Sequence, residues 1–133
     1  MDCLFCAIIA GEIPSRQVYA DDAAVAFLDI SPWHAGHTLV VPRRHVADAL
    51  SQPEALSEIA PAINATARLL TERLEAAGMN ILINSGAVSG QEVFHLHAHL
   101  IPRYADHPGM AALMERDSDI DLDAVHQRII AQA

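Results

Sequence analysis

The sequence feature that most constrains the fold is the segment His95–Pro102, which reads His-Leu-His-Ala-His-Leu-Ile-Pro. In a β-strand, side chains two positions apart point to the same face. The spacing therefore predicts a half-buried strand, with Leu96, Ala98 and Leu100 in the core and three imidazoles on one exposed surface. Histidine could simply fill the polar side of such a strand, but three of the eight histidines lie within five residues. Because imidazole is a nucleophile, proton carrier or metal ligand near neutral pH, the segment indicates a reactive surface.

Hydrophobic spacing predicts the other elements of the chain. A compact apolar segment over 3–10, followed by Gly11, indicates a short helix. Apolar residues three or four apart predict one long helix, with Ser51 as its N-cap, Gly78 as its C-terminal cap, and either a kink at Pro61 or a later start. The apolar face of this helix is expected to hold Leu56, Ile59, Ile63, Ala67, Leu70 and Leu74. The expected strands are 17–19, 24–28, 38–41, 79–84 and 94–101, with short helices after residue 108.

This arrangement of strands around one long helix predicts an α+β domain with an antiparallel sheet. The 133 residues suffice for a single domain spanning 1–133. A net charge of −9 argues against a general nucleic-acid binder, which needs a basic surface. No apolar run approaches the ~20 residues that span a bilayer, and Asp2 stands where a secretory signal would carry basic charge. We therefore expect a cytoplasmic protein without a membrane or nucleic-acid partner.

The histidine segment, with Arg103 after Pro102, resembles the motif of the histidine-triad (HIT) family. Similar segments precede it, in the order Phe5 with Gly11-Glu12-Ile13-Pro14, Phe27–Pro32, Gly36–Pro42, Asn84 and Gly90-Gln91. The resemblance covers nearly all of residues 3–104, leaves 105–133 as a C-terminal tail, and favours the bacterial Hint-like branch. It implies the HIT-like fold, with a five-stranded antiparallel sheet, one long helix and a short N-terminal helix. It also implies a two-fold homodimer that joins two sheets.

The resemblance further implies a nucleotide hydrolase or transferase that acts on purine nucleoside 5′-phosphoramidates or related conjugates of AMP or GMP. His97 would attack the α-phosphorus to form a nucleotidyl-histidine, and His37 and His99 would stabilise the developing charge. Gln91 would contact the bridging oxygen or the phosphate. No catalytic cofactor is expected. Without the resemblance, His37 could equally be a structural histidine, and Gln91 could equally be a turn residue.

The remaining nucleotide contacts are also assigned from the resemblance. Asp29 would accept hydrogen bonds from the ribose hydroxyls, and Asn84 would contact the ribose-phosphate region. The base would lie between apolar walls formed by Phe5, Ile13, Phe27 and Ile30. Glu92 departs from the Ser or Thr frequent in relatives, because an ionised carboxylate cannot donate a hydrogen bond and repels phosphate. Two alternatives stay open, namely a dinucleoside polyphosphate hydrolase and a non-catalytic AMP-binding or scaffold protein.

The two cysteines of the chain form a second constellation, Cys3-x-x-Cys6. Such a pair is by itself a weak signal, and two small buried thiols in a helix would explain it as well. The resemblance adds His45 and His95 as partners. Two thiolates and two imidazoles would complete a closed tetrahedral zinc site of the structural kind.

Overall fold

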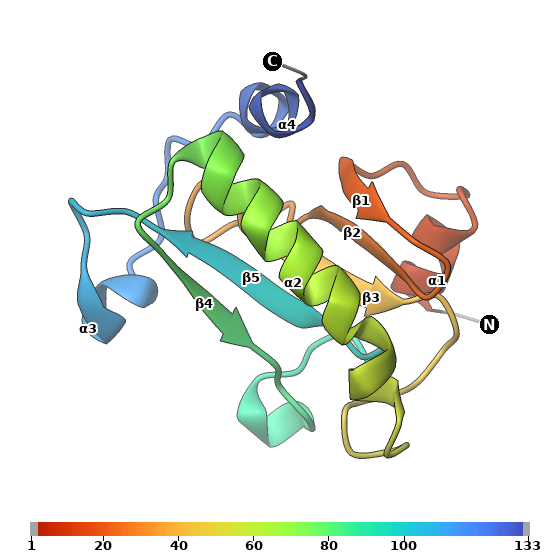
Figure 1. The fold of residues 1–133 in the computed structure, drawn as a ribbon. Coiled ribbons are helices and arrows are strands. Elements are labelled where there is room, and N and C mark those ends of the chain that lie inside the picture. The colour runs from red at the N-terminus through yellow and green to blue at the C-terminus, as the bar shows by residue number, and fades with distance from the viewer. Residues whose placement is uncertain (1–2, 132–133) are drawn as a thin grey trace.

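The computed structural model describes residues 3–131 and contains a five-stranded antiparallel sheet in the order β1-β2-β3-β5-β4 (Figure 1). The strands are β1 Gln17–Ala20, β2 Ala24–Leu28, β3 Thr38–Pro42, β4 Gly78–Leu82 and β5 Ala98–Arg103. All neighbouring strands pair antiparallel. The α+β class and the five expected strands are thus confirmed, with small differences in their ends.

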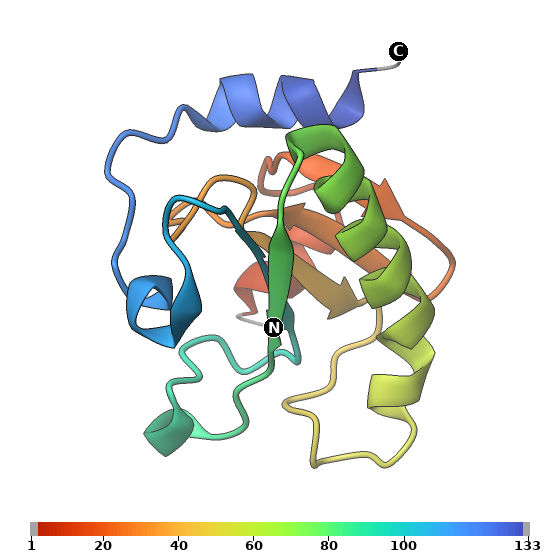
Figure 2. The same cartoon turned by 60° about the vertical axis from the view of Figure 1, so that its left-hand side comes forward.

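Helices cover both faces of the sheet. The helices are α1 Leu4–Ile9, α2 Ala55–Leu74, η1 Ala87–Ser89, α3 Gly109–Leu113 and α4 Leu122–Ile130. The long helix α2 crosses one face of the sheet (Figure 1), and α4 lies across one end of α2 (Figure 2). The expected short helices of the tail are therefore present. Among residues 3–131, no helix combines the length and the apolar composition needed to cross a membrane.

Successive side chains along β2 and β3 point to opposite faces of the sheet, and this divides the core into two layers. Ala26, Val40 and Leu100 belong to the large cluster that packs against α2. Val25, Phe27, Leu39 and Val41 belong to a smaller cluster with Phe5 of α1. Since β2 and β3 are buried along their whole length, both of their faces are covered. The smaller layer positions the functional site, as described below.

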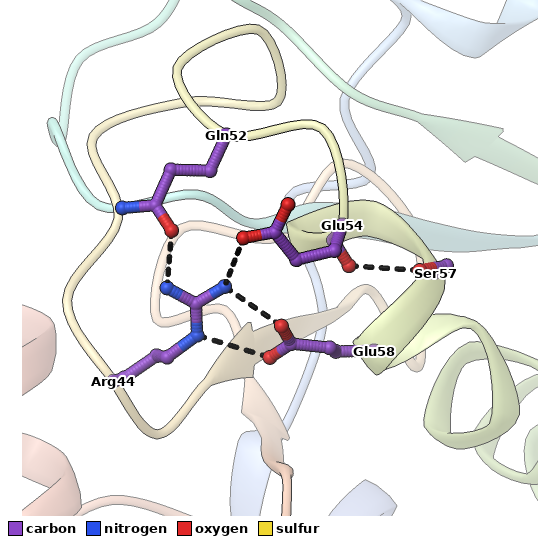
Figure 3. A network of polar contacts seen from close by, with 5 residues as sticks. All are labelled: Arg44, Gln52, Glu54, Ser57 and Glu58. Atoms are coloured by element: carbon purple, nitrogen blue, oxygen red, sulfur yellow. Dashed lines mark hydrogen bonds and ion pairs between the residues drawn. The ribbon is translucent and has the colours of Figure 1, made fainter.

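The start of α2 differs from the expected one. Ser51 does not cap the helix, because its backbone N–H and hydroxyl both donate to Asp48 at 2.8–2.9 Å. The helix begins at Ala55, after Glu54, so it starts later than Ser51 and still contains Pro61. Instead of capping, Glu54 lies 3.9 Å from the Arg44 guanidinium, which also contacts Gln52 and Glu58 (Figure 3).

The end of α2 and its buried face also require correction. The helix ends at Leu74, and the residue that caps it in the left-handed conformation is Glu75, with φ 55°, and not Gly78. Gly78 already belongs to β4, because the Ala77 N–H donates to the Arg103 carbonyl and brings the chain into the sheet. Leu56, expected on the buried face, is 39% exposed. The fully buried positions of α2 are Ala55, Ile59, Ala62, Thr66, Leu70 and Leu74.

The histidine segment lies only partly in a strand. Strand β5 begins at Ala98, so residues 95–97 precede it. This segment bonds to the turn after β3 instead of to a strand, since the Leu96 N–H donates to the Val46 carbonyl at 2.7 Å. Leu96, Ala98 and Leu100 are fully buried, as expected. The expectation of an exposed imidazole surface was wrong, because α1 covers His95 and His97 and leaves them 0% and 6% exposed.

Candidate active site

A cleft of about 440 Å³ opens on the sheet face that carries α1. The strand register places Phe27, Leu39 and His99 side by side across β2, β3 and β5, and all three line this cleft. The structure brings most of the expected catalytic and nucleotide-binding residues together there, namely Phe5, Ile13, Phe27, Asp29, Ile30, His37, Asn84, His97 and His99. These residues come from five separate segments of the chain.

His97 is held in one orientation by the backbone. Its Nδ1 lies 2.8 Å from the carbonyl oxygen of His95, an acceptor, so Nδ1 carries the proton and donates. In the neutral ring, Nε2 then has a free lone pair. The Phe5 ring packs edge-on against the imidazole, with ring centroids 5.1 Å apart. This arrangement matches the requirement that a nucleophilic imidazole be oriented by an acceptor on its other nitrogen.

His37 and His99 form a directed chain of hydrogen bonds. The Trp33 N–H donates to His37 Nδ1 at 3.0 Å, so the proton of neutral His37 resides on Nε2. This Nε2 lies 2.9 Å from His99 Nδ1 and donates to it. Consequently the proton of neutral His99 resides on its Nε2, and the backbone amide of Trp33 sets the tautomers of two imidazoles in turn.

Burial keeps both of these imidazoles neutral. Desolvation lowers the pKa of His37 to about 4, although the nearby Asp29 carboxylate acts in the opposite direction. Desolvation also lowers the pKa of His99 to about 4, helped by the neighbouring His37 and His97. Both rings therefore act at pH 7 as uncharged hydrogen-bonding groups.

Asp29 lies at the end of β2, where its Oδ1 accepts from the Ser31 N–H at 2.8 Å. Its Oδ2 lies 3.5 Å from His37 Nε2. Asp29, His37 and His99 thus place one possible ligand atom each within 4.8 Å of one another. This group does not suit a metal ion. The Trp33 N–H fixes the proton of His37 on Nε2, and Nε2 is the nitrogen that would have to bind the metal.

The expected apolar walls differ in exposure. Phe5 and Phe27 are each 3% exposed, and their rings contact each other edge-on with centroids 5.5 Å apart. Ile13 is 38% and Ile30 is 77% exposed. Two fixed aromatic rings at the base and two exposed isoleucines at the rim give the cleft an apolar side suited to a planar ring.

Gln91 does not belong to the cleft, so its expected contact with phosphate needs correction. The residue is 3% exposed, and its Oε1 accepts from the Gly86 N–H at 2.8 Å. Both protons of its Nε2 are directed at backbone carbonyls, those of Ala47 and Val93. The amide thus holds the loop after β4, which is the turn role that the sequence also allowed. Asn84 from the same loop does line the cleft.

Trp33 and Arg116 are among the lining residues that sequence reasoning did not assign to the site. The Trp33 ring is stacked parallel to His99, with centroids 6.5 Å apart, and Trp33 lies four residues before His37, which was the available signal. Arg116 belongs to the C-terminal tail, and no pattern in the sequence connects it to the histidines. Glu92 is exposed and also lines the cleft.

The four expected metal ligands also converge. Cys3, Cys6, His45 and His95 each place a ligand atom within 4.8 Å of the others. His95 Nε2 donates to the Pro42 carbonyl at 2.8 Å, so its Nδ1 has the free lone pair. This Nδ1 lies 3.4 Å from Cys3 Sγ and 3.5 Å from Cys6 Sγ. A tetrahedral zinc ion with ordinary bond lengths would separate sulfur and nitrogen by about 3.6 Å, so the residues fit zinc.

Comparisons with known proteins agree with this geometry. A family model described as the HIT domain matches residues 10–106. The chain belongs to the HIT family. It is 42% identical over 119 residues to "Protein hit" of Bacillus subtilis, and the match covers 89% of this chain and 82% of that protein. It is also 34% identical over 103 residues to the adenylylsulfatase HINT3 of Arabidopsis thaliana, covering 77% of this chain and 52% of that protein.

Among solved structures, this HIT protein is similar to a zinc-bound histidine triad family protein from Mycobacterium smegmatis. The TM-score is 0.84 at 37% identity, and the match covers 98% of this chain and 92% of that one. The fold described above is therefore the HIT fold.

Proposed function

We propose that this HIT protein hydrolyses or transfers the nucleotidyl group of purine nucleoside 5′-phosphoramidates or related nucleoside monophosphate conjugates. The observation that carries the proposal is the orientation of His97. Its Nδ1 is bonded to the His95 carbonyl, and its ring lines a cleft large enough for a nucleotide. A site that only bound AMP would not need a nucleophile held in this way.

The proposed reaction proceeds in two displacements. His97 Nε2 attacks the α-phosphorus, a new P–N bond forms, and the bond from phosphorus to the leaving amine breaks as the amine takes up a proton from water, which leaves a hydroxide ion. A second water molecule then attacks the nucleotidyl-histidine and gives its proton to that hydroxide, the P–N bond to His97 breaks, and the nucleoside monophosphate is released. His99 Nε2–H donates to the phosphoryl oxygens, where negative charge increases in the transition state.

The other cleft residues would hold the nucleoside. The Asp29 carboxylate lies close to His37 and would accept hydrogen bonds from the ribose hydroxyls, while Asn84 would contact the ribose-phosphate region. The base would lie against Phe5 and Phe27 beneath the exposed side chains of Ile13 and Ile30. We further propose one structural zinc ion at Cys3, Cys6, His45 and His95. It would join the start of α1 to the segment that carries His97.

Substitution of the nucleophile tests the proposal directly. His97→Ala is expected to abolish turnover of adenosine 5′-phosphoramidate and to change AMP affinity by less than about tenfold, or 1.4 kcal/mol. Acid quenching of the wild-type protein during turnover of a labelled substrate should trap the nucleotide on the protein. The variant should trap none.

The control is His126→Ala, which removes a histidine that does not line the cleft and whose ring bonds to the Gln17 carbonyl. This variant should retain both turnover and trapped nucleotide. If His97→Ala keeps a tenth or more of the wild-type kcat, His97 is not the nucleophile. If the wild-type protein binds AMP but neither turns over nor traps nucleotide, the protein is a nucleotide-binding module instead.

A further inference from the structure

Arg116 lies between the cleft and a second hollow of the surface. The second cavity, of about 690 Å³, is formed by residues of α2, β5 and the tail together with His34 and Ala35 before β3. Arg116 lines both cavities, and no other residue between 3 and 131 does. Arg116 therefore lies at the boundary between the two cavities.

Among the cations of the two cavities, Arg116 has the guanidinium that is free to bind a ligand. Arg16 lines the cleft but donates to Asp123 at 2.8 Å. In the second cavity, Arg128 lies 3.3 Å from Glu75, and Arg103 donates to the side chain of Asn80 and to two carbonyl groups. Within residues 3–131, the side chain of Arg116 has neither an ion pair nor a hydrogen bond.

The backbone holds Arg116 beside the catalytic histidines. The N–H of the next residue, Asp117, donates to the Trp33 carbonyl at 2.8 Å, and the Trp33 N–H donates to His37 Nδ1. The positive charge of Arg116 is close enough to His37 to contribute to the lowered pKa of that imidazole. The chain as a whole carries a net charge of −9, so a local cation is needed to hold a ligand with several negative charges.

We infer that Arg116 binds an oxyanion attached beyond the α-phosphate of the bound nucleotide, and thereby selects leaving groups that carry negative charge. This inference rests on the proposed function, because it places the α-phosphate at His97 and His99. The base would lie against the apolar walls from Phe5 and Ile13, and we place the leaving group toward Arg116, whose charge acts on His37. A guanidinium can donate two parallel hydrogen bonds to one phosphate or sulfate group.

Binding of AMP and ADP provides the test, because the two ligands differ by one terminal phosphate. The chain has one tryptophan, Trp33, and its fluorescence reports occupation of the cleft. Arg116→Gln should weaken ADP binding about tenfold and AMP binding less than twofold, and Arg116→Lys should recover part of the ADP affinity. The ADP effect should decrease in high salt. Arg68→Gln removes the same charge from an exposed position of α2 that lines neither cavity, and should change neither affinity.

Turnover separates this inference from the proposed function. Arg116→Gln should lower kcat/KM for adenosine 5′-phosphosulfate about tenfold relative to adenosine 5′-phosphoramidate, whose leaving group carries no negative charge. Equal losses for AMP and ADP would overturn the inference, since Arg116 would then contact the α-phosphate. Unchanged affinity for both ligands, or no binding of either by the wild-type protein, would also overturn it. A wild-type protein that shows the AMP and ADP difference without any turnover would refute the proposed function and retain the role of Arg116.

Discussion

At the scale of single residues, backbone groups determine the protonation of the cleft histidines. The His95 carbonyl fixes Nδ1–H on His97, and the Trp33 amide fixes Nε2–H on His37 and then on His99. A side chain in any of these supporting positions could rotate or be lost by substitution, whereas a carbonyl or an amide within the packed fold cannot. The site therefore presents one lone pair, on His97, and one proton, on His99, to the same ligand.

The low pKa values of His37 and His99 predict how stability depends on pH. Both imidazoles are neutral in the folded protein down to about pH 4, but in the unfolded chain they are protonated below about pH 6.5. The unfolded state thus binds more protons in this window, so the free energy of unfolding should be greatest above pH 6.5. It should fall with decreasing pH by about 1.4 kcal/mol per pH unit for each histidine.

Urea unfolding at several pH values between 6.5 and 5 checks this prediction. His99→Gln should reduce the change in the free energy of unfolding with pH by the contribution of one histidine, about 1.4 kcal/mol per pH unit. His107→Gln, which removes an exposed imidazole, serves as the control. A slope that is the same in the His99 variant and in the wild-type protein would show that His99 is not kept neutral by the fold.

At the scale of secondary-structure elements, α1 connects the cleft to the proposed zinc site. Helix α1 contains Phe5, which packs against His97, and it also contains Cys6. Cys3 directly precedes this helix. On the other side, His95 offers its Nδ1 to these sulfurs and its carbonyl to His97. The proposed zinc ion would therefore stabilise the position of His97 through a single residue.

Metal analysis and thermal unfolding test the zinc proposal. Protein purified without chelator should contain about one zinc ion per chain, and Cys3→Ser should contain none. The loss should lower Tm by roughly 10 °C, because a few kcal/mol are removed and each shifts Tm by roughly 3–5 °C in a domain of this size. Adding zinc to chelated wild-type protein should restore Tm. A chelated protein with the same Tm before and after zinc addition would end the proposal.

At the scale of the whole molecule, one edge of the sheet is available for pairing. Strand β4 lies at the end of the strand order, and its Ile81 is 54% exposed, whereas the opposite edge strand β1 packs against α4. An exposed edge with an apolar side chain is suited to pairing with a second strand. We therefore propose that the expected homodimer joins two sheets through β4.

Light scattering tests the dimer and the edge that forms it. The wild-type protein should have the mass of a dimer at micromolar concentration, and Ile81→Lys should be monomeric, because two like charges would face each other near the two-fold axis. Val88→Lys adds the same charge at a fully exposed residue of η1 and should remain dimeric. A monomeric wild-type protein would contradict the dimer, and a dimeric Ile81→Lys variant would place the interface elsewhere.

The sequence by itself determined the elements and most of the site. Alternation of histidine and apolar residues predicted the burial of Ala98 and Leu100 in β5, because strand periodicity is a local property of the backbone. Leu96 is buried as well, although it precedes the strand. Resemblance to the HIT family supplied His37 and Asp29, which lie far from His97 in the chain but line the same cleft. Local signals failed where another local contact competed with them, as at Ser51, whose hydroxyl bonds to Asp48, three residues earlier, instead of capping α2.

Only the tertiary structure decided what the polar groups do. The amide of Gln91 bonds to the backbone of Gly86, Ala47 and Val93, and the residue does not line the cleft. Arg116 reaches the cleft from the tail, because the Asp117 N–H is bonded to Trp33. The proton of each imidazole was likewise invisible in the sequence, since it depends on whether a donor or an acceptor lies against each ring nitrogen. The partners of His97 and His37 lie near them in the chain, at His95 and Trp33. Whether these backbone groups face a ring nitrogen depends on the folded path of the chain, which the local pattern of a sequence does not encode.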